Sequence, residues 1–236
     1  MKERSWAWPE WMVTARVSFQ VITGLRKAKK GNIFIGPRET TNCSPLEVMK
    51  EGVAHIPQER KNVGLILDFN LKENLILQNF RVPPFSKYKF LNPRVIDEHA
   101  IQLISSYSIK ASSPNLMARQ LSGGNQQKLI LARELSRVPK LLVAVQPTRG
   151  LDIGATEYIH SKLIELRDRR TGILLISTDL NEILSLSDMI AVISGGEIMG
   201  TLSTESADIE TIGLMMAGIQ KNLEPMPRAP TTLFAR

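Results

Sequence analysis

The chain has 236 residues, of which 43% are hydrophobic, and a net charge of +7. This length is enough to bury the core of one domain with a subdomain, and the single cysteine excludes an internal disulfide framework. No apolar stretch approaches the ~20 residues that span a bilayer, and no apolar leader is present, so we expect a cytoplasmic chain. The basic run at 26–30 contains no aromatic residues, so we predict no nucleic-acid partner.

The first nineteen residues contain all three tryptophans of the protein, Trp6, Trp8 and Trp11. They follow neither a helical nor an alternating period that would bury them. The pattern becomes regular from Val21, where a helix end is expected near Gly24.

Between residues 31 and 60 short helices and strands alternate. Residues 31–36 predict an edge strand, and Ser44 before Pro45 predicts the N-cap of a helix that reaches Lys50. Residues 53–56 have the pattern of a strand, which Pro57-Gln58 leaves. Taken alone, Gln58 is compatible with a polar surface turn.

From residue 68 to residue 120 helical patterns dominate, with helices predicted at 71–80 and 94–107 on either side of Pro83-Pro84. Three apolar residues of this segment could form either a groove for a partner or the segment's own core, and we favour the core. They are Phe69, Leu75 and Phe80.

Residues 121–128 are Leu-Ser-Gly-Gly-Asn-Gln-Gln-Lys, followed by a helical run to about Arg137. Two glycines, a hydroxyl and the free N–H groups of a helix start can cradle a phosphate, although such a stretch taken alone is more often a plain N-cap with a turn. A buried strand is predicted at 141–145, and the turn after it ends in Gly150-Leu151-Asp152.

The remainder continues the alternation of helices and strands, which predicts a mostly parallel sheet. The predicted helices are 155–168, 180–186 and 209–219, and the predicted strands are 172–177, 189–193 and 197–202.

In this order of motifs the sequence resembles the ATP-binding cassette (ABC) ATPases, whose Leu-Ser-Gly-Gly-Gln signature precedes a Walker B strand and a Gly-Leu-Asp D-loop. With Arg149 and the Asn-Gln-Gln-Lys end of the signature, it is most similar to the second cassette of the fused two-cassette ATPases of sugar and nucleoside importers. The resemblance covers residues 21–220, and we interpret the chain as an N-terminally truncated, degenerate second cassette.

The resemblance implies an α/β fold, namely a P-loop NTPase-like ABC cassette with a mostly parallel sheet and an inserted helical subdomain. The RecA-like core would comprise residues 21–68 and 121–220, and the helical signature subdomain residues 69–120. Residues 1–20 would be a non-native-looking N-terminus, and residues 221–236 a tail.

Hydrolysis of ATP needs a Gly-rich loop with a lysine, an acidic residue for Mg²⁺ and a group that activates water. The sequence has no G-x-x-x-x-G-K-[ST] loop. At the family's Walker B Asp and catalytic Glu positions stand Val145 and Gln146, and at its switch His position stands Thr178. Since valine cannot bind a metal and an amide cannot act as a base, we predict that the chain alone is inactive and binds no metal itself.

The signature and the D-loop are intact by contrast. ABC cassettes pair head to tail, so the resemblance implies that this chain contacts ATP in the site of a partner cassette, with Mg²⁺ bound through that partner. Gln58 matches the family's Q-loop glutamine. The residues predicted to contact ATP are Ser122, Gly123, Gly124, Asn125, Gln126, Gln58 and Asp152.

The implied function is to power import of a sugar or nucleoside at the cytoplasmic face of the cell membrane, as a peripheral subunit. The implied partners are a competent ABC cassette, transmembrane permease subunits and, indirectly, a substrate-binding protein. Two alternatives stay open: a non-functional remnant of a frame-shifted transporter gene, and a soluble ABC protein without a transport role.

A frame shift is a specific hypothesis for residues 1–19. Codons for residues 10–19, read two bases further along, permit Val-Asp-Gly-Asn-Gly-Gln-Ser-Glu-Leu, the family's degenerate Walker A loop. The Asp-Gly step is forced, because Trp11 and Met12 have one codon each. We therefore expect a chain that lacks the strand and loop of its own nucleotide site and has a poorly packed N-terminus, which resequencing of the gene and an intact mass would test.

Overall fold

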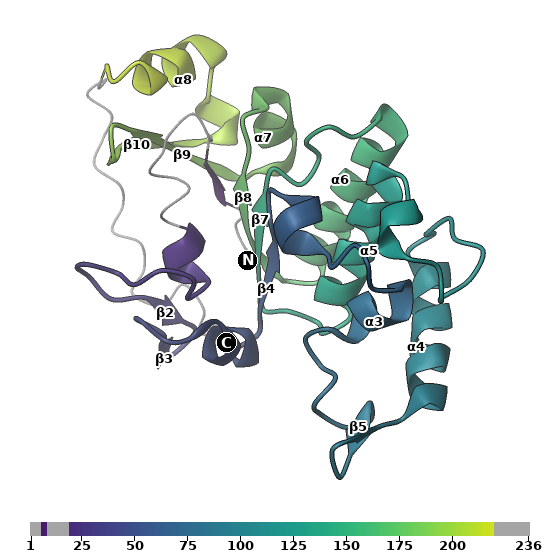
Figure 1. Cartoon of the computed structure of the whole chain (residues 1–236). Coiled ribbons are helices and arrows are strands. Elements are labelled where there is room, and N and C mark those ends of the chain that lie inside the picture. Colours follow the sequence, from purple (N-terminus) through teal and green to yellow (C-terminus); the bar gives the residue numbers. More distant parts are fainter. Residues whose placement is uncertain (1–5, 9–18, 220–236) are drawn as a thin grey trace. The chain divides into compact units, whose positions relative to one another are not determined.

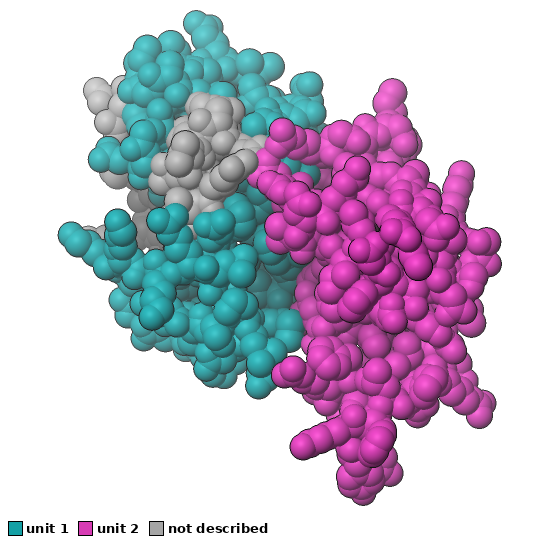
Figure 2. Space-filling model, viewed as in Figure 1, with its two compact units in different colours: residues 1–55, 139–146, 163–236 teal, residues 56–138, 147–162 magenta. Residues whose placement is uncertain are grey.

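The computed structural model describes residues 6–8 and 19–219, and the chain divides into two compact units (Figure 2). Unit 1 comprises residues 1–55, 139–146 and 163–236, and unit 2 comprises residues 56–138 and 147–162. The predicted tail from residue 221 lies outside the described residues.

Unit 1 is built on a six-stranded sheet with the order β10-β9-β1-β8-β7-β4 (Figure 1). β1 pairs in parallel with both β8 and β9, and β7 pairs in parallel with β8, whereas β10 runs antiparallel to β9. This confirms the predicted mostly parallel sheet. The strands are β1 (Trp6–Trp8), β4 (Val53–Ile56), β7 (Leu141–Val145), β8 (Gly172–Ile176), β9 (Met189–Ser194) and β10 (Glu197–Ser203).

The core of unit 1 is formed by apolar side chains of β7, β8 and β9 together with residues of the N-terminal third. Its buried members include Phe19, Val48, Val143 and Ile176. The near-continuous apolar runs of β7 and β8 are typical of strands that are covered on both faces. The other elements in or entering this unit are β2 (Phe34–Ile35), β3 (Arg38–Glu39), α2 (Pro45–Lys50), α6 (Ile153–Asp168), α7 (Leu180–Leu186), the 3₁₀ turn Thr204–Ser206 and α8 (Ile209–Met216).

Strand β1 corrects the expectation that the N-terminal residues contain no strand of the cassette sheet. It fills the central place in the sheet, between β8 and β9. The N–H and C=O groups on the facing edges of β8 and β9 need hydrogen-bond partners. A strand between them supplies these partners even though its sequence does not alternate between apolar and polar residues. Aromatic residues are also favoured in strands. The predicted lack of a strand is therefore wrong, and residues 9–18, where the loop was expected to be missing, lie outside the described residues.

Unit 2 is mainly helical, as predicted for the segment after residue 68. Unit 2 begins with a short π-helix at Arg60–Gly64. Its α-helices are α3 (Leu71–Ile76), α4 (Pro93–Ser106) and α5 (Gly123–Leu135). Two very short strands, β5 (Ser86–Lys87) and β6 (Phe90–Leu91), form a hairpin, and a 3₁₀ turn covers Ala118–Gln120. Helix α3 is shorter than predicted because a tight turn follows it, in which the N–H of Asn79 donates to the carbonyl of Ile76.

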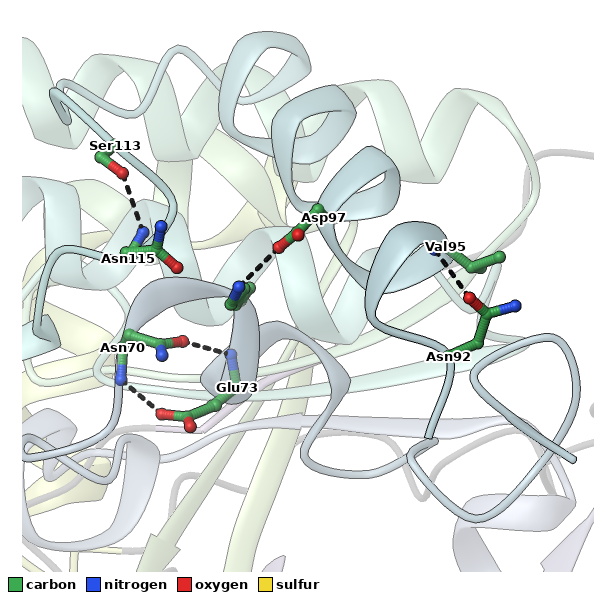
Figure 3. Close-up of polar contacts among 8 residues, drawn as sticks. Asn70, Glu73, Asn92, Val95, Asp97, Ser113 and Asn115 are labelled. Carbon is green, nitrogen blue, oxygen red and sulfur yellow. Dashed lines mark hydrogen bonds and ion pairs between the residues drawn. The ribbon is translucent and has the colours of Figure 1, made fainter. Parts of the chain in front are cut away.

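Capping groups and ion pairs fix the ends of these helices (Figure 3). Asn70 and Glu73 form a capping box at the start of α3, and Asn92 accepts a bond from the N–H of Val95 at the start of α4. Lys72 of α3 and Asp97 of α4 form an ion pair with an N–O distance of 2.6 Å. The two helices are thus tied to each other as well as capped.

The boundary of the helical unit differs from the predicted boundaries at 69 and 120. Helix α5, which carries the signature, packs against α3 and α4 and so belongs to unit 2. The predicted core role is confirmed for Leu75, which is buried, but is wrong for Phe69 and Phe80, which are 41% and 38% exposed. Both phenylalanines lie just outside α3, where the helical period no longer directs them inward.

Candidate functional site

The signature residues form the N-terminus of α5 in unit 2. Ser122 has an extended backbone and is the N-cap, with its hydroxyl oxygen accepting from the N–H of Asn125 at 3.4 Å. The side-chain amide of Asn125 donates to the same oxygen at 3.0 Å. Because that oxygen already accepts these bonds, the hydroxyl proton of the exposed Ser122 is available to a ligand.

The second glycine of the signature lies against the start of α6. A Cβ on Gly124 would stand 3.0 Å from the Cβ of Ala155 and 3.9 Å from a carboxylate oxygen of Asp152. Asp152 caps α6 by accepting from the N–H of Ala155 at 2.8 Å. The signature and the D-loop, thirty residues apart in the sequence, are therefore packed together through a glycine that leaves little space for a side chain.

Arg60 brings a cation to the same place, and it was not among the residues predicted from the sequence. Its guanidinium donates to the carbonyl of Arg149 at 2.9 Å and lies 3.6 Å from the position of a Cβ on Gly123. Partial burial lowers the pKa of Arg60, which still keeps its charge at neutral pH. Its place two residues after Gln58, on the same exit from β4, was the only sequence signal for it.

The structure places the other predicted contacts in different surroundings. The side-chain oxygen of Asn125 accepts from the N–H of Lys110 at 2.9 Å, which holds the start of α5 against the preceding loop. Gln126 is buried, and its amide donates to the carbonyl of Ala118 at 3.2 Å, so its side chain serves the interior of unit 2. Gln58 is half-buried and lies in the sequence two residues after the end of β4 and two before Arg60.

The second group of predicted residues lies in unit 1, at the end of β7. Val145 is fully buried opposite Ile176 of β8, and Gln146 after it has a φ of 49° and is 6% exposed. The amide of Gln146 donates to the hydroxyl of Thr178 at 3.0 Å. The structure thus joins by a hydrogen bond the two residues that the resemblance assigned to the family's catalytic Glu and switch His positions.

These two groups differ in the ligands that they fit. The N–H groups at the start of α5, the hydroxyl proton of Ser122 and the Arg60 guanidinium can each donate to a ligand, which suits a phosphate group. Val145 and Gln146 offer no carboxylate to Mg²⁺. Within residues 6–8 and 19–219, no three His, Cys, Asp or Glu side chains gather so as to hold a metal ion. No helix in this part of the chain is long and apolar enough to cross a membrane.

The family model described as "ABC transporter" matches residues 17–149, more than half of the chain. Among curated proteins, the chain is 44% identical over 199 residues to the nucleoside import ATP-binding protein NupA of Lactococcus lactis and 43% identical to the guanosine import ATP-binding protein NupO of Bacillus subtilis. It is 40% identical to the ribose import ATP-binding protein RbsA of Streptococcus agalactiae. These matches cover 84% of this chain but only about two fifths of the length of each relative.

The fold is similar to that of solved ATP-binding cassettes. One, a dimeric cassette in a post-hydrolysis state with ADP and Pi, superposes with a TM-score of 0.72 at 20% identity and covers 86% of this chain and 87% of the other. Another ABC transporter cassette gives a TM-score of 0.74 at 21% identity over 93% and 88% of the two chains. The predicted α/β cassette fold is therefore confirmed, and the chain belongs to the ABC transporter family.

Proposed function

We propose that this chain is an ATP-binding cassette of an importer for nucleosides or sugars, and that it contacts ATP in a site completed by a partner cassette. The names of the relatives support the transport class, since they import nucleosides, guanosine or ribose. A complete importer would also need transmembrane permease subunits, with the cassette attached at the cytoplasmic face of the membrane.

The observation that carries the proposal is the contrast between the two groups of site residues. The start of α5 presents an unused hydroxyl proton, helix N–H groups and the Arg60 guanidinium. At the end of β7, the Gln146 amide is bound to Thr178 instead. A chain with donors for phosphate, but with no base or metal ligand at its own strand end, is suited to act on ATP that another cassette holds.

In this arrangement each residue has a separate task. Ser122 donates its proton to a terminal phosphate oxygen, and the first N–H groups of α5 bind the same charge. Asp152 and Gly124 keep the D-loop against the signature, and Arg60 adds long-range attraction for the anion. Mg²⁺, when bound with ATP, would neutralise phosphate charge through ligands of the partner cassette.

The test is Ser122→Arg in a complex with a competent cassette and its permease. Loss of the N-cap serine should cost about 0.5–2 kcal/mol, which we expect the chain to withstand, while the long side chain occupies the space at the helix start where the phosphate would lie. We expect turnover to fall by at least ~100-fold, the scale of losing a main oxyanion contact. The matched control is Ser112→Arg, the same change at an exposed serine of the same unit, which should leave turnover unchanged.

Normal turnover in the Ser122→Arg complex would rule out the contact in trans. Failure of the wild-type chain to co-purify with a permease and an intact cassette would favour the remnant or the soluble ABC protein.

A further inference from the structure

The β5–β6 hairpin of unit 2 carries large apolar side chains that the protein does not bury. Tyr88 is 84% exposed and Phe90 is 80% exposed, and Leu91 beside them is also exposed. By contrast, Phe85 at the base of the hairpin is buried with Ile76 and Ile96. The hairpin, labelled β5 in Figure 1, is therefore anchored to the helices by one aromatic residue, while Tyr88 and Phe90 are exposed to solvent.

The tip is formed by residues that a tight turn does not favour. Lys87 pairs with Phe90, so Tyr88 and Lys89 are the two central residues of the turn, with φ values of 51° and 69°. Asn-Gly is the preferred pair for such a turn, because both positions need a left-handed backbone. Tyr-Lys at strained positions points to selection for what the tip contacts rather than for ease of folding.

The surroundings of the tip are cationic. No aspartate or glutamate occurs from residue 74 through residue 96, whereas four basic residues do. Arg94 is paired with Glu98, so the free positive charge near the tip comes from Arg81, Lys87 and Lys89. Two of these cations lie over aromatic rings, Arg81 over Phe80 at 5.1 Å and Lys87 over Tyr88 at 5.4 Å.

We propose that this hairpin inserts its tip into the headgroup region of an anionic membrane. Tyrosine and phenylalanine side chains flanked by lysine are the combination that lies at a membrane–water interface, with the rings among the headgroups and the amines on anionic lipid. The complementary charge is that of the cytoplasmic leaflet, which attracts clustered lysine and arginine. A projecting tip without a pocket suits a fluid lipid surface better than a protein partner, which would need a shaped recess.

The surface is separate from the residues proposed to contact ATP, so its test needs no nucleotide. The full chain is sedimented with vesicles of phosphatidylcholine alone or of phosphatidylcholine with about 30% phosphatidylglycerol. The second composition gives the vesicles a strong negative surface potential. We expect binding to the anionic vesicles, weakened when the salt is raised from about 0.1 M to about 0.5 M because the charges are screened.

The decisive variant is Tyr88→Asn with Lys89→Gly, which removes the aromatic ring and the charge while giving the turn its preferred residues. Its stability against urea should equal or exceed that of the wild type, because the backbone strain is relieved. Its partitioning into anionic vesicles should nevertheless fall by about tenfold or more, since one lysine alone contributes about fivefold.

The matched control uses the other short hairpin, β2–β3, which has an exposed Phe34 and lies after the basic run at 26–30. Phe34→Asn with Lys30→Gly removes one aromatic residue and one lysine there and should change partitioning by less than about twofold, because the tip is intact. The proposal is overturned if the tip variant binds anionic vesicles as tightly as the wild type, if the control loses as much binding, or if the wild type binds neither kind of vesicle. If the wild type binds neither kind of vesicle, an acidic protein becomes the candidate partner for the tip.

Discussion

At the scale of single residues, the Gln146–Thr178 bond explains why the end of β7 is stable without a carboxylate. An amide can both donate to and accept from a hydroxyl, and both bonds occur here, at 3.0 Å and 3.3 Å. A glutamate at the same 6% exposed position would have to give up hydration for a single neutral partner. The residue type at this site thus follows from its burial.

Gln146→Glu should therefore leave the isolated chain inactive and make it less stable at high pH. Burial raises the pKa of the new carboxyl above its value of about 4.3 in the unfolded chain, so the free energy of unfolding falls as the pH rises from there through the folded pKa. We expect a loss of about 1–3 kcal/mol at pH 8 and little loss near pH 4, where the acid can donate to Thr178. Urea unfolding across this pH range measures it, and equal stability at both ends would contradict the burial argument.

The two signature glycines provide a second residue-scale prediction, with one serving as the control for the other. A Cβ on Gly124 would meet Ala155 at 3.0 Å, whereas a Cβ on Gly123 would make only ordinary contacts, with the end of the flexible Arg60 at 3.6 Å and with Leu151 at 3.9 Å. Gly124→Ala should be less stable than Gly123→Ala by about 1–2 kcal/mol, because both gain the same helix propensity but only the first crowds α6. Chemical unfolding of both variants tests this, and identical midpoints would contradict it.

At the scale of elements, a largely buried polar network ties α5 to the turn that follows α3. Glu134 accepts from the Arg133 guanidinium at 2.9 Å and from the amide of Gln78 at 2.7 Å, and Arg137 donates to the oxygen of Gln78 at 2.8 Å. Burial also lowers the pKa of Arg137. Every group in this network is at least partly removed from water, so removal of one member leaves the others without compensation.

Glu134→Ala should accordingly destabilise the chain by about 3–5 kcal/mol, because it leaves the charge of the buried Arg133 uncompensated. Glu98→Ala is the control, since it breaks the Arg94–Glu98 pair on the exposed face of α4 and should cost less than about 0.5 kcal/mol. Thermal unfolding separates the two, and a similar loss in both would show that burial does not decide the effect.

Much at this scale could be predicted from the sequence, and the exceptions have physical causes. β7, α7 and the Ser44 cap of α2 were predicted at or very near their bounds, because apolar runs and capping residues are local signals. The signature and D-loop motifs were recognisable, but Arg60 was not, because its importance depends on a contact 89 residues away. The exposure of Phe69 and Phe80 could not be predicted from composition, since it depends on where α3 ends.

At the scale of the whole molecule, strand β1 shows how tertiary demands override local pattern. Trp6–Trp8 has no strand-like alternation, yet it completes the sheet by pairing with β8 on one side and β9 on the other. The frame-shift hypothesis for residues 1–19 stays a prediction about the gene. The observed strand does not test this hypothesis, because a strand can form from many sequences, whereas a phosphate-binding loop needs particular residues.

The isolated chain should bind ATP more weakly than about 1 mM and show no turnover, because one helix N-terminus with a hydroxyl and a nearby cation is a small share of a nucleotide site. Adding a competent cassette and its permease should raise the affinity and restore hydrolysis, since each cassette then supplies contacts that the other lacks. Equilibrium dialysis measures binding, and phosphate release measures turnover, with heat-denatured chain as the blank. The Ser122→Arg chain, prepared in the same way, reveals any contaminating ATPase, because a contaminant would be equally active in both preparations. Turnover by the isolated wild-type chain that exceeds both controls would contradict the prediction and show that the residues at 145, 146 and 178 do not disable it.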